Sequence, residues 1–179
     1  MRKFLGAALA AATAGVMLFS ANAAALDGIS VGDPVIGTLV SPQIQLGSIS
    51  HCTGSTVSGV VGYDNGVGNG GGGPVTAASF SGCRTLGSSS TVTANGLPWA
   101  LDIDGAGNMT LSDINVTLRW GLLSCTFEGA VSGLYDPMSG DVVLSGSLTR
   151  TAGSSLCGSS QPVVGTYNVV DQFGVPVQL

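Results

Sequence analysis

The side chains that could perform catalysis are few, and their spacing does not suit a catalytic site. The one histidine, His51, is followed directly by Cys52. A hydrolytic triad needs a histidine that hydrogen-bonds a free nucleophile, and a cysteine in a disulfide offers no thiol. The chain also has no Gly-x-Ser-x-Gly motif to present a serine. We therefore predict a protein that is not an enzyme, with no catalytic residue, and interpret His51 as lying at the end of a surface strand.

Carboxylates are the next groups that could act chemically. A glycosidase needs two carboxyl groups facing each other across a cleft, whereas Asp102 and Asp104 lie two residues apart and would share one face of a strand. The stretch 102–108, with Asp113 beyond it, partly resembles a calcium loop. Ala106 occupies the fifth offset, where that loop needs a ligand. An ordinary Asp/Gly hairpin explains the pattern, and we predict no metal or other cofactor here.

Two tryptophans, Trp99 and Trp120, could form a recognition surface. Large aromatic side chains are usually buried, so both are interpreted first as core anchors. The functional alternative is a platform for a sugar or a lipid. In that alternative Trp99, Asp102 and Asp104 are the candidate binding residues.

Four cysteines indicate a disulfide framework. They are Cys52, Cys83, Cys125 and Cys157, and four cysteines allow three pairings. They lack C-x-x-C spacing, which argues against zinc. Two antiparallel strands that fold about a central turn bring their far ends together. Hairpin geometry therefore predicts the pairs Cys52–Cys83 and Cys125–Cys157.

The N-terminal segment predicts export. Residues 1–23 combine a short basic start, an Ala-rich apolar stretch and a small-residue exit, as in a secretory signal peptide. Removing this segment leaves residues 24–179 with three arginines, no lysine and ten acidic residues, a net charge of −7. Such a chain does not suit phosphate backbones, so no nucleic-acid partner is expected. No later stretch is apolar and long enough for a transmembrane helix. Localisation is predicted to be extracellular or in the cell envelope.

Short runs of Val, Ile, Thr, Leu and Ser, separated by Gly, Asn-Gly, Asp-Gly and Pro, are typical of antiparallel strands. The expected strands lie at 30–46, 52–61, 75–80, 90–94, 100–103, 109–119, 124–134, 142–149 and 163–170. The apolar parity in 109–119 changes after Asp113, which indicates a β-bulge. Turns are expected at 104–108 and 136–140, and 62–73 is expected to be a flexible Gly-rich loop.

The two Cys-to-Cys segments have similar sequences, as in an internal repeat. Both 52–83 and 125–157 begin with Cys-Thr, continue with Val-Ser-Gly and then Tyr-Asp, and end on a cysteine. A duplicated hairpin is one explanation and chance convergence is the other.

The remaining motifs stand together: a signal, Cys52-Thr53, Phe80-Ser81-Gly82-Cys83, Gly96-Leu97-Pro98-Trp99, Cys125 in a Gly-rich hairpin and the late Cys157. Over about residues 45–170 this arrangement resembles a family of small secreted bacterial proteins, some of which are called protein activator of alkane oxidation. The resemblance implies an all-β, disulfide-bonded extracellular protein that meets hydrophobic substrates. It supplies no catalytic residues, and the 62–73 segment departs from its pattern.

The sequence therefore predicts one all-β domain, an antiparallel sandwich or flattened barrel of eight to ten strands with two disulfides. The leading hypothesis is a secreted, non-enzymatic accessory protein of the envelope or exterior that contacts apolar molecules or cell-surface components. Exposed apolar strand faces would make that contact. One alternative is a pore or barrel subunit of an outer layer. Another is a carbohydrate-binding or inhibitor module.

Overall fold

The computed structural model describes residues 29–178 and shows fourteen strands and one short 3-10 turn. The predicted signal peptide, residues 1–23, lies outside the described residues. The strands are β1 (Pro34–Leu39), β2 (Ile44–Leu46), β3 (Ser50–Cys52), β4 (Gly54–Val60), β5 (Tyr63–Asp64), β6 (Gly70–Ser81), β7 (Arg84–Thr85), β8 (Ser88–Ser89), β9 (Thr91–Asn95), β10 (Trp99–Asp104), β11 (Asn108–Trp120), β12 (Leu123–Asp136), β13 (Asp141–Gly153) and β14 (Ser160–Asp171). The 3-10 turn, η1, covers Ser155–Cys157.

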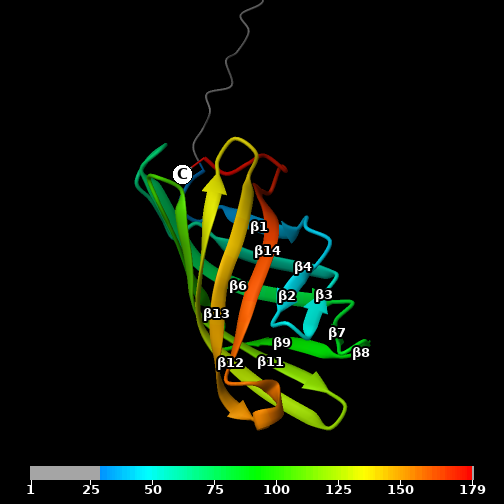
Figure 1. Ribbon diagram of the computed structural model, residues 1–179. Coiled ribbons are helices and arrows are strands. Elements are labelled where there is room, and N and C mark those ends of the chain that lie inside the picture. Colours follow the sequence, from blue (N-terminus) through cyan, green and yellow to red (C-terminus); the bar gives the residue numbers. More distant parts are fainter. Residues whose placement is uncertain (1–28, 179) are drawn as a thin grey trace, which may run out of the picture.

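Eight of these strands close into an antiparallel barrel, in the order β1-β4-β6-β10-β11-β12-β13-β14 (Figure 1). The barrel closes because β1 also pairs with β14, with Val35 opposite Asp171 and Leu39 opposite Tyr167. The lower part of β14 pairs with β2, and β2, β3, β7 and β8 continue outside the barrel. The all-β prediction and its barrel alternative are confirmed. The strand number exceeds the expected eight to ten because β2, β3, β5, β7 and β8 have only two or three residues, too few to leave a periodic signal.

Alternation along the strands separates the inside of the barrel from the outside. In β10, Trp99 and Ile103 are buried, whereas Asp102 and Asp104 between and after them are exposed. The same period of two, set by the pleat of a strand, fills the interior from the other long strands. Besides the disulfide-bonded Cys125, the buried apolar residues of β11 to β14 are Met109, Leu111, Ile114, Val116, Leu118, Phe127, Val131, Tyr135, Val142, Leu144, Leu148, Val163 and Tyr167.

The predicted bulge in β11 is confirmed. The register between β11 and β12 shifts between Leu111 and Ile114. Asp113 sits in the shift with a φ of 59°, a left-handed conformation that aspartate tolerates better than most residues. The extra residue in the bulge shifts the alternation of apolar side chains by one position. Both halves of the strand therefore keep their large side chains inside the barrel.

The Gly-rich segment 62–73 is not the flexible loop expected from composition. Tyr63–Asp64 forms β5, and the glycines from 70 to 73 begin β6 and pair with β10. A Cβ on Gly72 would lie 2.2 Å from the Leu101 carbonyl oxygen, and one on Gly73 would lie 2.1 Å from that of Val60. The glycines are therefore needed for close approach of neighbouring backbones, which composition alone does not distinguish from a linker.

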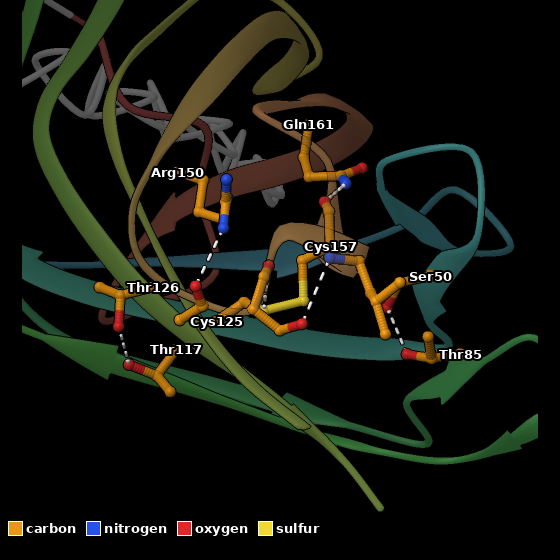
Figure 2. Close-up of a disulfide and its surroundings, with 11 residues drawn as sticks. Ser50, Thr85, Thr117, Cys125, Thr126, Arg150, Cys157 and Gln161 are labelled. Carbon is orange, nitrogen blue, oxygen red and sulfur yellow. Dashed lines mark hydrogen bonds between the residues drawn. A yellow bond between two sulfur atoms is a disulfide. The ribbon is translucent and has the colours of Figure 1, made fainter. Parts of the chain in front are cut away.

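Both predicted disulfides are present, Cys52–Cys83 and Cys125–Cys157. Figure 2 shows the second, which joins the start of β12 to η1. Beside it Arg150 Nη1 donates to the Gly153 carbonyl at 2.9 Å. The first Cys-to-Cys hairpin supplies β4 and β6, which are second and third in the eight-strand order. The second hairpin supplies β12 and β13, which are sixth and seventh. This spacing suits a duplication, which stays a prediction.

The predicted turns at 104–108 and 136–140 are both present, at the same end of the barrel. In each turn an aspartate side chain binds backbone amides. Asp104 accepts hydrogen bonds from the amides of Ala106 and Asn108 at 2.9 Å. Asp136 accepts from the Met138 amide at 2.9 Å. Such bonds stabilise the ionised carboxylate and lower its pKa. The bond from the Asn108 side chain is the main cause for Asp104, and the bond from the Met138 amide is the main cause for Asp136.

These two turns predict a loss of stability in acid. The folded-state pKa of Asp104 and of Asp136 lies below the unfolded value. Their stabilisation is therefore present above the unfolded pKa and is lost as the pH falls through the folded one. We expect the melting temperature to decline below about pH 4. The double variant Asp104→Asn/Asp136→Asn should decline less over the same range in a fluorescence melt. An equal decline would assign acid sensitivity to other groups.

One turn places a large apolar side chain where it strains the backbone. Leu86, between β7 and β8, has a φ of 48° and is followed by Gly87 at 81°. Two residues with positive φ form a tight hairpin turn, for which Asn-Gly is the favoured pair. Leucine in this conformation costs roughly 1–2 kcal/mol. The Leu86 side chain is 60 % exposed, so burial does not offset that cost.

Candidate apolar site in the barrel interior

The barrel encloses a cavity of about 80 Å³ near its middle. Its walls come from β4, β6 and β10 to β14 of the barrel and from β2, which pairs with β14, whereas β1 supplies no lining residue. The lining residues are Ile44, Leu46, Val57, Val75, Phe80, Trp99, Leu101, Met109, Leu111, Ile114, Val116, Val131, Val142, Leu144, Leu148, Val163, Tyr167 and Val169.

Among the lining side chains one hydroxyl occurs, and it is already paired. Tyr167 Oη donates to Ser55 Oγ at 2.8 Å. Burial raises the pKa of Tyr167 to about 12, although the bond to Ser55 acts in the opposite direction. Tyr167 is therefore neutral at any physiological pH. The cavity presents no charge and no nucleophile, so its chemistry is limited to contact with apolar groups.

A second, smaller cavity of about 40 Å³ lies next to the first. Val75, Leu101 and Val169 line both, so these three side chains form the wall between them. Tyr135 and Val177 lie beside the smaller cavity, and Tyr135 Oη donates to the Val177 carbonyl. Burial raises the pKa of Tyr135, so it too is neutral. The C-terminal segment thus closes this end of the interior.

The size of the main cavity limits its ligands. An engineered cavity of about 150 Å³ lined by Leu, Ile and Phe stays dry and binds benzene or xenon. At about half that volume, the present cavity suits xenon or an alkane of a few carbons. Eight-stranded barrels have interiors that side chains just fill or that hold one small ligand.

The three candidate binding residues do not lie on one surface. Trp99 is 3 % exposed, lines the cavity and donates its indole N–H to the Asn95 carbonyl at 2.9 Å. Asp102 points outward and accepts a hydrogen bond from the Tyr63 hydroxyl. That bond, with smaller effects of burial and of the Asp102 charge, raises the pKa of Tyr63. Asp104 is occupied by its own turn. The structure separates the indole from both carboxylates because they occupy opposite faces of β10.

Trp120 and His51 lie away from the cavity. Trp120 ends β11 and is half-buried. His51 is half-buried in β3, opposite Arg84 of β7. Neither residue contacts the interior described above.

Sequence reasoning missed one surface groove. Its volume is about 640 Å³, and its lining includes Ser112, Asp113, Asn115 and Glu128 at the bulge. Glu128 accepts a hydrogen bond from Asn115 Nδ2 at 2.8 Å. The bulge was visible in the sequence, but the neighbour across it depends on the β11–β12 register, which sets Asn115 opposite Glu128.

The described residues contain no cluster of three or more His, Cys, Asp or Glu side chains arranged to hold a metal ion. Within residues 29–178, no helix has the length and apolarity needed to cross a bilayer.

Fold and site together define a small disulfide-bonded antiparallel barrel with an apolar cavity. No protein-family model, curated protein or solved structure matches the chain. The resemblance to the activators of alkane oxidation therefore stays a prediction.

Proposed function

We propose that the protein is a secreted, non-enzymatic accessory protein that binds small apolar molecules inside its barrel. The observation that carries the proposal is the cavity inside the barrel, which is lined by apolar side chains. Its one lining hydroxyl is bonded to Ser55, so an entering ligand would meet no unpaired polar group. Contact with apolar material agrees with the leading expectation from the sequence.

Secretion is supported by three features. The N-terminal residues read as an export signal. All four cysteines are paired, and disulfides persist mainly in oxidising compartments. The acidic, lysine-free composition of residues 24–179 keeps an exported protein soluble.

The interior favours this proposal over the two alternatives. A conducting pore has a polar, water-filled lumen, whereas apolar side chains fill this barrel. A sugar-binding platform needs an exposed aromatic ring beside polar groups, and the Trp99 indole lies inside.

Xenon is the probe for the cavity, because it is apolar and of suitable size. We expect xenon to bind the wild-type protein and to raise its melting temperature, since a ligand that binds only the folded state stabilises it. The variant Val142→Ile/Val163→Ile adds methyl groups to the cavity wall and should weaken binding.

The matched control is Val143→Ile/Val164→Ile. These neighbours lie on the same two strands and are exposed, so the same chemical change should leave xenon binding as in the wild type. Absence of xenon binding, or an equal loss in both pairs, would contradict the proposal. The binding is measured by xenon NMR, with the melting temperature as a second readout.

A further inference from the structure

Three exposed leucines gather at the end of the barrel opposite the aspartate-rich turns. Leu122, in the β11–β12 turn, is fully exposed, and Leu156 of η1 is 74 % exposed. Leu86 lies in the β7–β8 turn. These segments are far apart in sequence but meet around one small hollow, which is lined in part by Thr85, Trp120, Leu123 and Leu156. Figure 1 shows the turn between β11 and β12 and the orange segment between β13 and β14, which contains η1, on the side of the barrel away from the C-terminus.

Leu86 is the informative member of this group. Its positive φ strains a leucine, and Asn would satisfy the same turn. Its amide donates to the Ile49 carbonyl at 2.9 Å, which fixes the turn beside the hollow. The side chain therefore weakens the fold without filling the core. Such a residue is best explained by contact with something outside the chain.

The same end carries all three arginines of the described residues. Arg84 and Arg119 are exposed and Arg150 is half-buried. Arg84 and Arg150 donate to the carbonyls of Gly87 and Gly153, which belong to their own turns. The segments 49–53, 84–89, 119–124 and 150–159 contain no Asp or Glu. We name this surface, made of the three leucines, the three arginines and Trp120, the arginine end.

Seven of the nine acidic residues that the structure describes lie toward the other end, and Asp113 and Glu128 lie at the β11 bulge between the two ends. Seven aspartates occupy the turns and strand ends there, namely Asp33, Asp64, Asp102, Asp104, Asp136, Asp141 and Asp171. Strand β13 has 13 residues, which span roughly 40 Å at about 3.4 Å per residue. This is several times the Debye length of about 8 Å at physiological salt. A charged surface at the arginine end therefore interacts with Arg84 and Arg119 and hardly with the seven aspartates, although Glu128 lies opposite Thr149, next to Arg150.

We propose that the arginine end docks onto a lipid bilayer that carries anionic headgroups. The three leucines would enter the interface, and the exposed Arg84 and Arg119 would contact the phosphate groups, whereas Arg150 lies on the inward-facing side of β13 with its Nε buried. Apolar side chains among basic ones are the usual composition of an interfacial anchor, and anionic lipid attracts each nearby arginine. A second copy of the chain suits this end poorly, because a twofold contact would bring the same arginines together. The docking site is separate from the cavity, so each proposal can fail alone.

The test is co-sedimentation of the full mature protein with phosphatidylcholine vesicles, with and without phosphatidylglycerol. We expect binding to the anionic vesicles, falling as salt is raised. Leu122→Ser should lower the partition coefficient roughly tenfold, and Arg119→Gln about fivefold. The matched control is Phe173→Ser at the far end of the barrel. Phe173 is 79 % exposed, and its replacement should not change vesicle binding.

Two further readouts separate docking from a structural role. Brominated phosphatidylglycerol vesicles should quench Trp120, and Trp120→Phe should abolish this quenching because Trp99 is enclosed. Leu86→Asn should weaken vesicle binding while it raises the melting temperature. Equal binding to both vesicle types, no binding to either, or a dimer in solution that Leu122→Ser dissociates would overturn the proposal.

Discussion

Replacing Trp99 with alanine is expected to lower the free energy of unfolding by about 3–5 kcal/mol, as for other large aromatic side chains removed from a core. Trp99 is 3 % exposed, and its indole N–H is bonded to the Asn95 carbonyl. The change removes apolar contacts and enlarges the cavity that Trp99 lines. Chemical denaturation followed by circular dichroism measures the loss.

Trp99→Phe is the companion variant, because it keeps an aromatic ring in the core and should lose clearly less stability. The enlarged cavity of Trp99→Ala should also accept a larger apolar molecule, so benzene should raise its melting temperature more than that of the wild type. Unchanged stability in Trp99→Ala, together with loss of binding on a glycan array, would instead favour the carbohydrate-binding alternative.

The second large expected effect is the loss of folding stability when both disulfides are removed. The sequence separations are 31 for Cys52–Cys83 and 32 for Cys125–Cys157. Loop-closure entropy for such separations corresponds to about 3–4 kcal/mol for each bond. Each double-alanine variant is expected to lose that amount, and the four-alanine variant should be largely unfolded at 37 °C. Urea denaturation measures the two single-bond variants.

The two bonds should act nearly independently, because they close different segments of the barrel. A comparison of the two double-alanine variants with the four-alanine variant tests this additivity. Free thiols in the purified protein, or a four-alanine variant as stable as the wild type, would contradict the expectation.

Much of the local structure could be predicted because it depends on neighbours in the chain. The 104–108 and 136–140 turns follow from Asp and Gly at defined positions. The β11 bulge follows from a change of apolar parity at Asp113. The cysteine pairing follows from hairpin geometry, and it is confirmed. Each of these rules acts over a few residues or within one hairpin.

Composition misled at 62–73, where a run of glycines suggested flexibility. The same residues are typical of a linker and of a strand whose backbone is approached closely. Only the partners distinguish the two, here the carbonyls of Leu101 and Val60. The relevant contact is between distant segments, so no local pattern contains it.

The amino-acid sequence was sufficient to predict the β class, the turns, the two disulfides and the alternation along each strand. The fold was needed to show that β1 pairs with β14 to close a barrel, which side of β10 faces inward, and that the arginines and most aspartates lie toward opposite ends. Alternation of apolar and polar residues places side chains on two faces of a strand, but it does not show which face points into the barrel. Closure and register between strands far apart in the chain make that choice, and with it they create the cavity and the arginine end.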